Sequence, residues 1–244
     1  MRDASAAREA RAEEHGQGHH HRDVSGGWLR PAVFGAMDGL VTNVSLIAGV
    51  GGSGVHTHFV ILTGLAGLVA GAGSMAAGEY VSVSSQNELV GAEVKKEARE
   101  LERNPDAEQR ELAATFRERG VEPALASEVA AQISAHPQHA LNVHVREELG
   151  VDPQDLPSPL VAGGASLASF AAGALIPLIP YLAGASSLWL SLVLAALAAI
   201  IGGGMVARMT DRPFIRGAAR QLILGVFAAA ITFGIGHLVG GSVG

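Results

Sequence analysis

The sequence predicts an all-α integral membrane protein, in which five transmembrane helices carry a helical cytoplasmic domain inserted between the second and the third. The first observation is composition, since 48% of the 244 residues are hydrophobic and only 16% are charged. The second is clustering: a spanning helix needs about 20 mostly apolar residues, and five segments are long enough. These segments are 31–52, 57–83, 158–182, 186–207 and 214–240.

The apolar segments divide the chain into four regions. We expect a disordered, histidine-containing tail over 1–25, transmembrane helices one and two over 26–87, an acidic helical domain over 88–157, and transmembrane helices three to five over 158–240. The first apolar segment starts too late for a cleavable signal. In the third, Pro177 and Pro180 predict an irregular outer end.

The basic residues predict which way the helices run. All 17 lysines and arginines lie before the first apolar segment, in the polar insert, or around the junction of segments four and five, from residue 208 to residue 220. With five spans these regions share one side of the membrane, and the positive-inside rule makes that side cytoplasmic. We therefore expect the N-terminus and the insert to lie in the cytoplasm and the C-terminus to lie outside. Around the junction of segments four and five, arginines at every fourth residue from 208 to 220 suit anionic lipid headgroups.

The polar insert is expected to be helical throughout, because alanine and charged residues dominate it. Pro105 suits the first turn of a helix, Gly120 a stop, and Pro123 a new start. We expect helices near 84–103, 106–119, 123–135 and 138–149. The first should continue directly from the second apolar segment, since no glycine or proline lies between Gly78 and Gly91.

The insert is acidic, which favours a cation over nucleic acid as its ligand. From Glu88 to Asp155 it has 15 acidic and eight basic residues, a net charge of −7, against −6 for the whole chain. Side chains three or four residues apart share a helix face, and this spacing recurs on three helices. The residues are Glu93, Glu97 and Glu100, then Glu108 and Glu111, then His144 and Glu148. If the three helices bring these side chains together, they would bind a hard or borderline divalent cation. The alternative is a solvated surface on which Lys95 and Arg99 form ion pairs with some of the glutamates.

Two carboxylates lie inside the apolar segments, where an ionised side chain costs at least ~2.5–3.5 kcal/mol on insertion scales. Asp38 lies about two turns into the first segment, and Glu79 lies toward the cytoplasmic end of the second. Such residues most often mark an ion or proton path. The alternatives are a helix-packing hydrogen bond for Asp38 and a side chain that reaches the membrane surface for Glu79.

Met75 and Asn43 complete a candidate transport path with these carboxylates. Met75 lies four residues before Glu79 and shares its helix face. A thioether beside carboxylates disfavours Mg²⁺ and Ca²⁺ and favours softer ions such as Fe²⁺; ordinary packing is the alternative for Met75. The chain has no cysteine, which excludes thiolate metal sites, iron–sulfur clusters and disulfides.

These motifs resemble the vacuolar iron transporter family, in its bacterial branch without a ferritin-like domain. The resemblance is carried by GGWLRPAVFGAMDGLVTNVSLIAGV (26–50), GSMAAGEYVSVSSQNEL (73–89) and REELGV (146–151). It implies a protein of a bacterial inner (plasma) membrane, with five transmembrane helices per subunit, and a homodimer with the translocation path at its interface. It also implies that Fe²⁺, and often Mn²⁺, moves out of the cytosol against an inward proton flow.

The resemblance implies roles for individual residues as well. In family members, an Asp on the first transmembrane helix and a Met on the second line the translocation path. Asp38 and Met75 stand at these positions here, and Glu79 is the Glu of the GEY motif. Three cytoplasmic helices of the family collect metal through glutamates. The residues at the matching spacing are Glu97, Glu100, Glu108, Glu111 and Glu148. Some members supply Met on the third of these helices, where this chain has His144, so whether His144 replaces a soft ligand stays open.

The sequence thus predicts a non-enzymatic, proton-coupled exporter of Fe²⁺, with Mn²⁺ as a second cargo. Its expected partners are a second copy of the chain, membrane lipids, divalent metal ions and protons, with no nucleic acid and no prosthetic group. One rival is a membrane-anchored metal sensor or buffer that binds without transporting. Another is a small-solute channel in which Asp38 only packs. The preference among Fe²⁺, Mn²⁺, Co²⁺ and Zn²⁺, the number of bound metals and the proton stoichiometry stay open.

Overall fold

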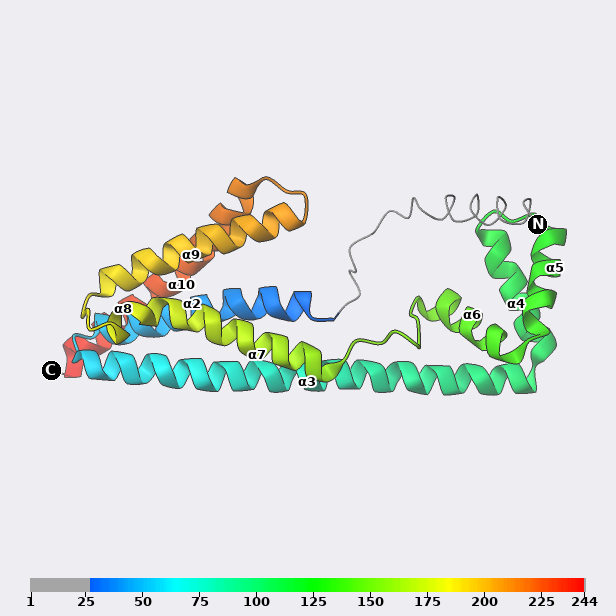
Figure 1. Ribbon diagram of the computed structural model, residues 1–244, viewed down its shortest axis with the longest axis horizontal. Helices are drawn as coiled ribbons and strands as arrows, with labels where there is room; N and C mark the ends of the chain where they lie inside the picture. Colours follow the sequence, from blue (N-terminus) through cyan, green and yellow to red (C-terminus); the bar gives the residue numbers. More distant parts are fainter. Residues whose placement is uncertain (1–26, 244) are drawn as a thin grey trace, which may run out of the picture.

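The computed structural model describes residues 27–243, and its elements there are helices, without a strand (Figure 1). Five of them, with α7 and α8 taken together, are long and apolar enough to cross a membrane. The predicted all-helical class and the five apolar spans are therefore confirmed, whereas the predicted tail over 1–25 lies outside the described residues. The membrane-length elements are α2 (Leu29–Gly52), α3 (Thr57–Arg103), α7 (Pro159–Leu175) with η2 (Ile176–Leu178) and α8 (Ile179–Leu182), α9 (Leu188–Met209) and α10 (Phe214–Val243).

The longest helix, α3, has 47 residues and runs along almost the whole molecule (Figure 1). At 1.5 Å per residue it is about 70 Å long, more than twice what the hydrocarbon core of a membrane needs. Its sequence is apolar over 57–83 and polar from there to its end. The predicted continuation of the second span into the first helix of the insert is thus confirmed.

Three short helices follow α3 and match the predicted helices to within one residue at each end. They are α4 (Pro105–Glu118), α5 (Pro123–Ser134) and α6 (Pro137–Leu149). Each begins with a proline, whose missing N–H is one that the first turn leaves unpaired in any case. The Glu122 side chain accepts hydrogen bonds from two backbone N–H groups at the start of α5, both at 3.0 Å. Gly120 and Gly150, after α4 and α6, have φ of +90° and +66°, which glycine adopts at little cost.

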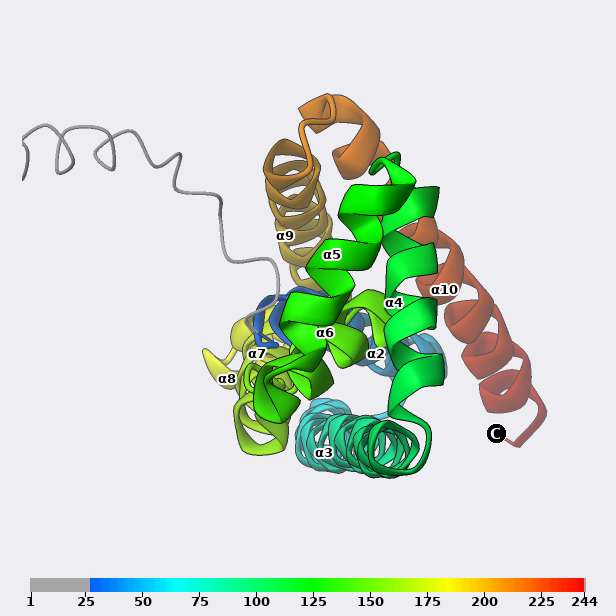
Figure 2. The ribbon, with the colours of Figure 1, turned by 90° about the vertical axis from the view of Figure 1, so that its right-hand side faces the viewer.

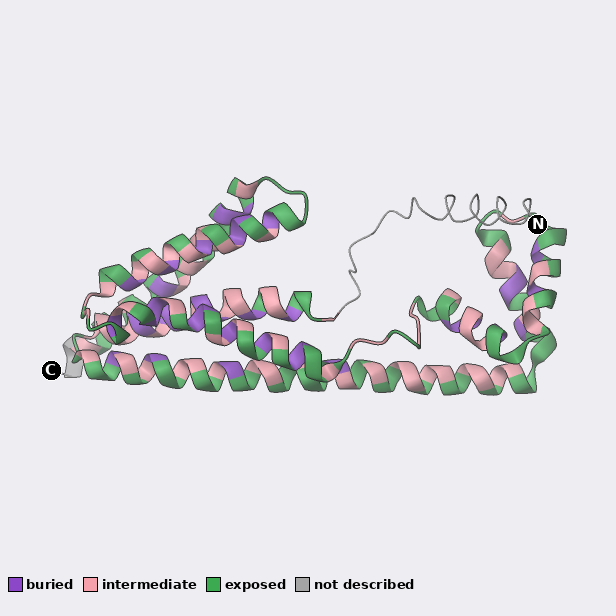
Figure 3. Cartoon of the chain, in the orientation of Figure 1, coloured by how far each residue is buried: buried purple, intermediate pink, exposed green. Residues whose placement is uncertain are grey.

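A small hydrophobic core holds α4, α5 and α6 together above the polar end of α3 (Figures 2 and 3). Leu112 and Ala113 of α4 and Ala130 of α5 are buried there. Partly buried side chains from α4, α5 and α6 surround them: Phe116, Ile133 and Val143. We use the name acidic region for residues 88–157, which contain these helices and the polar end of α3.

The remaining elements form a bundle in which backbones approach each other closely. We use the name membrane bundle for α2, the apolar part of α3, and α7 to α10. A Cβ atom on Gly39 of α2 would overlap the backbone of α7 at Phe170, and one on Gly173 of α7 would overlap α2 at Ala36. Gly203 of α9 and Gly217 of α10 face each other in the same way. Small residues at helix contacts are typical of membrane proteins.

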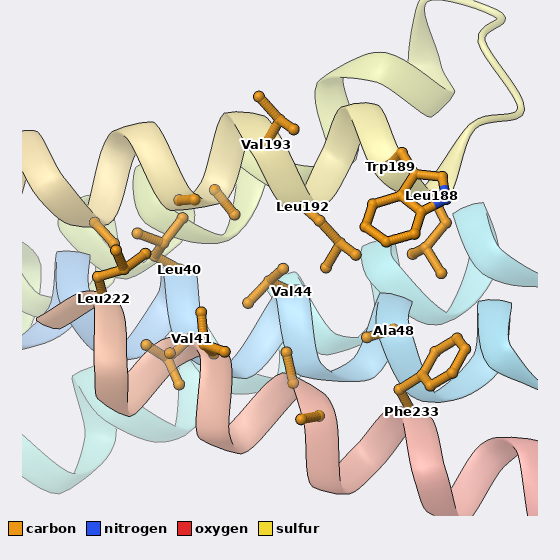
Figure 4. A pocket seen from close by; sticks show the side chains of 17 residues that line it. Leu40, Val41, Val44, Ala48, Leu188, Trp189, Leu192, Val193, Leu222 and Phe233 are labelled. Atoms are coloured by element: carbon orange, nitrogen blue, oxygen red, sulfur yellow. The ribbon is translucent and has the colours of Figure 1, made fainter.

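An open apolar groove of about 560 Å³ lies where α9 and α10 separate above α2 (Figure 4). Leu40, Val44 and Ala48 of α2 contribute to one side, and Trp189 and Phe233 approach one end. The outer faces of α9 and α10 also expose large apolar side chains. Surfaces of this composition suit hydrocarbon, and the groove contains none of the carboxylates considered as site residues.

Candidate metal centre

Four potential metal ligands from three helices converge in the acidic region. They are Glu97 of α3, Glu108 of α4, and His144 and Glu148 of α6, and one ligand atom of each lies within 4.8 Å of all the others. We call these four residues the acidic cluster. Three carboxylates and one imidazole are a ligand set that divalent transition metals accept.

His144 lies at the centre of the acidic cluster and is 1% exposed. Its Nδ1 atom is 3.1 Å from an oxygen of Glu148, 3.2 Å from one of Glu97 and 3.9 Å from one of Glu108. The other ring nitrogen, Nε2, is buried and has no hydrogen-bond partner among the described residues. The ring therefore presents a single nitrogen to all three carboxylates.

The way α6 packs explains why His144 points inward. Ala140 lies one turn before His144 and Val145 directly follows it, and both are buried, so this face of α6 is turned toward the neighbouring helices. An ion pair between Arg119, just after α4, and Glu147 ties α6 to its neighbour. The sequence did not predict this ion pair. Glu147 lies three residues after His144, but a spacing within one helix does not reveal a partner on another helix.

The acidic cluster concentrates negative charge in a partly buried place. Burial first, and then the negative charge of Glu148, raise the pKa of Glu97 to about 7, although His144 acts in the opposite direction. The pKa of Glu108 is also raised, first by burial and then by the charge of Glu111. Neighbouring carboxyl groups disfavour each other's ionisation, because their negative charges repel. A cation bound between them would favour the ionised form of all of them.

Three of the seven residues predicted for this site lie outside the acidic cluster. Glu93 forms an exposed ion pair with Lys96 at 3.6 Å, and Glu100 accepts a hydrogen bond from Asn104 at 3.2 Å. Glu111 is exposed and close enough to raise the pKa of Glu97 and Glu108. The alternative of a solvated glutamate surface therefore describes Glu93 and Glu100, while Glu111 adds charge at the edge of the cluster.

The predicted path residues form no comparable group in the described part of the chain. Asp38 is half-buried in α2 and accepts a hydrogen bond from the Thr42 hydroxyl at 3.4 Å. Met75 packs against a cluster that includes Phe170 of α7. Glu79, also on α3, is half-buried. Among the described residues, no group of three histidine or carboxylate side chains that could hold a metal ion includes Asp38 or Glu79.

Asn43 has a structural contact within the subunit. Its side chain is fully buried, and its Nδ2 atom donates a hydrogen bond to the backbone carbonyl of Ala174 on α7. Its Oδ1 atom is buried without a hydrogen-bond partner among the described residues. Asn43 therefore joins α2 to α7, and its predicted part in the transport path stays a prediction.

Five of the described helices are of membrane length, and one of them extends into the acidic cluster. The protein is thus of the class of integral membrane proteins, with a candidate cation site in its polar part. The model of the VIT family matches residues 29–237, which is most of the chain. The protein belongs to the VIT family.

Similar proteins match over nearly the whole sequence. The chain is 40% identical to "Vacuolar iron transporter" of Acanthamoeba castellanii, over 91% of this chain and 83% of that protein. It is 32% identical to "Vacuolar iron transporter 1" of Oryza sativa subsp. japonica, over 91% of this chain and 90% of that protein. It is 34% identical to "Vacuolar iron transporter homolog 1" of Arabidopsis thaliana, over 87% of this chain and 84% of that protein. The resemblance to the vacuolar iron transporter family is confirmed at the level of the family.

Proposed function

We propose that the protein exports Fe²⁺, with Mn²⁺ as a second cargo, from the cytosol by proton antiport. The acidic cluster carries this proposal, because it lies on the polar extension of α3, the helix that also contains Met75 and Glu79 in its apolar part. One uninterrupted helix would thus join a site that collects cations to the Met75 thioether and the Glu79 carboxylate at membrane depth. The names of the relatives support iron as the cargo.

The proposed orientation places the acidic region in the cytoplasm of a bacterial cell and the C-terminal end of α10 outside. It rests on the positive-inside rule. Four exposed arginines run from the end of α9 to the start of α10, at positions 208, 212, 216 and 220. They would lie at the same membrane surface as the acidic region. This orientation puts the metal-collecting site on the side from which metal leaves.

We place the membrane site at the interface of a homodimer. One subunit supplies Asp38 and Met75, and Glu79 lies one turn further along α3. In the described residues of one chain, no group of three histidines or carboxylates forms around Asp38. A twofold axis that doubles Asp38 and Met75 would supply further ligands. A carboxylate that binds either a proton or a metal ion can exchange one for the other, which is what antiport needs.

A second candidate function is a membrane-anchored metal sensor or buffer. The observation in its favour is that the acidic cluster is complete within one chain, so it could bind metal without any membrane path. It predicts tight metal binding without flux, and it leaves Asp38 dispensable.

Reconstitution in liposomes separates these functions. Vesicles would contain a metal-sensitive dye and a pH-sensitive dye, and Fe²⁺ or Mn²⁺ would be added outside. We expect metal entry with opposite proton movement in the wild type and its loss in Asp38→Ala. Asp211→Asn is the control, because Asp211 is an exposed acidic residue between α9 and α10. Unchanged flux in Asp38→Ala would contradict the membrane site, and binding without flux in the wild type would favour the buffer.

A further inference from the structure

We propose that His144 determines which metal ion the acidic cluster prefers, by supplying Nδ1 as its one nitrogen ligand. The inference rests on the proposed function in one respect, that the acidic cluster is where the cargo first binds. It goes further by assigning selectivity to a single atom. Three observations support it: the separations around Nδ1, the absence of sulfur from the cluster, and the surroundings of Nε2.

The separations around Nδ1 fit a shared coordination sphere. Two ligands that each lie about 2.1 Å from one metal ion, at angles between octahedral and tetrahedral, are roughly 3.0–3.4 Å apart. Nδ1 lies 3.1 Å from Glu148 and 3.2 Å from Glu97, with Glu108 slightly farther away at 3.9 Å. A single N–H group cannot donate well to three carboxylates at once, whereas a cation between them would be attracted to all four atoms.

The chemistry of the four ligands predicts a particular order of affinities. Carboxylate oxygens suit Mg²⁺, Ca²⁺ and Mn²⁺, whereas imidazole nitrogen suits Fe²⁺, Ni²⁺ and Zn²⁺, and affinities at nitrogen and oxygen sites rise from Mn²⁺ through Fe²⁺ to Co²⁺. The acidic cluster contains no sulfur, so softness cannot provide the discrimination. His144 therefore separates transition metals from Mg²⁺ and Ca²⁺, and separates Co²⁺ and Fe²⁺ from Mn²⁺.

The surroundings of Nε2 suggest a site that also releases its metal. A metal-binding histidine usually donates its other N–H group to an acceptor, and loss of such a partner typically costs 10–100-fold in affinity. In the described part of the chain Nε2 has no partner. An imidazole bound through Nδ1 but unsupported at Nε2 discriminates between metals without retaining them as firmly as a storage site would.

Metal titrations of the full-length protein in detergent test this assignment. Calorimetry would measure binding of Co²⁺, Mn²⁺ and Mg²⁺, each alone, to the wild type and to His144→Gln. We expect the wild type to bind Co²⁺ at least about tenfold more tightly than Mn²⁺, and His144→Gln to lose about tenfold or more for Co²⁺ but far less for Mn²⁺. His139→Gln is the matched control, because His139 is an exposed histidine on the same helix.

A spectroscopic measurement keeps the test independent of how well the variant folds. Pulsed electron paramagnetic resonance of Mn²⁺ bound to the wild type should show coupling to an imidazole nitrogen, and His144→Gln should lack it. Equal loss of Co²⁺ and Mn²⁺ affinity in His144→Gln, or wild-type Mn²⁺ without nitrogen coupling, would overturn the proposal. Retained selectivity in a protein that moves no metal in liposomes would instead leave His144 assigned and refute only the transport function.

Discussion

The membrane bundle and the acidic region are both helical, yet they are held together in opposite ways. In the membrane bundle, glycines let the backbones of α2 and α7 touch, and much of the large apolar surface stays exposed. In the acidic region, side chains such as Leu112 fill a small core. In lipid, apolar side chains gain no hydrophobic free energy by packing against each other, so close van der Waals contact between helices must stabilise the bundle. In water, burial of apolar side chains is itself favourable. Larger side chains at the helix contacts should therefore destabilise the membrane bundle, and smaller side chains in the core should destabilise the acidic region.

The largest effect is expected from a side chain added to the membrane bundle. Gly39→Leu would drive a leucine into the backbone of α7, where neither helix can yield without separating from the other. We expect little or no folded protein, measured as the monodisperse fraction in size-exclusion chromatography in detergent. Gly164→Leu on α7 is the control, because a Cβ atom there meets nothing within 4 Å. A normal yield of Gly39→Leu would show that these backbones do not need their close contact.

A side chain removed from the acidic region should come next. Leu112 is 2% exposed in the core between α4 and α5, and Leu→Ala changes in cores typically cost about 2–5 kcal/mol. We expect Leu112→Ala to lower the unfolding midpoint of the acidic region in urea, followed by circular dichroism. Leu125→Ala, at a position 52% exposed on α5, should change it little. Equal effects of the two substitutions would contradict the core.

A change of charge without a change of shape tests the acidic cluster itself. Glu108→Gln removes one of three carboxylates and should lower the affinity for Co²⁺ by about 10–100-fold, comparable to other losses at metal sites. The measurement is calorimetry on the full-length protein. Glu118→Gln on the same helix carries the same change at an exposed position and should leave the affinity unaltered. If both variants bind like the wild type, Glu108 is not a ligand.

The smallest effect is expected from pH. The pKa of Glu97 is raised from 4.5 to about 7, so the folded protein holds this proton more tightly than the unfolded chain. The corresponding stability is present below pH 4.5 and is lost as the pH rises through 7. The groups that face Glu97 are Glu148, His144, Glu108 and Glu111.

In the presence of a chelator we therefore expect the acidic region to unfold at a lower temperature at pH 8 than at pH 5.5. Because metal replaces the proton, Co²⁺ affinity should rise over the same interval. Glu97→Gln should reduce the dependence of the melting temperature on pH. A melting temperature that rises with pH in the chelated wild type would contradict the raised pKa.

The helices could be predicted from the sequence because local signals determine them. Pro105, Pro123 and Pro137 each begin a helix, and the absence of proline after Gly78 predicted the continuous α3. Apolar runs of membrane length likewise gave the five spans.

The choice among the glutamates could not be predicted in the same way. Spacing places Glu93, Glu97 and Glu100 on one face of α3, but it does not say which turn of that face meets α6. The path of the chain from the end of α3 back to α6 brings Glu97 opposite His144 and leaves Glu93 beside Lys96. Asn43 shows the same limit, because its hydrogen bond to Ala174 joins residues 131 positions apart.

The length of α3 also has an electrostatic consequence. Glu79 and Glu97 are 18 residues apart on one straight helix, which is about 27 Å. In physiological salt the Debye length is about 8 Å, so solvent ions screen the charge of one site almost completely before it reaches the other. An ion that binds at Glu97 therefore changes the potential at Glu79 very little. If occupancy of the acidic cluster affects the membrane residues, the coupling is mechanical. It is carried by a displacement along α3 or through the segment that joins α6 to α7, where the Asn87 side chain of α3 donates a hydrogen bond to the backbone carbonyl of Pro157.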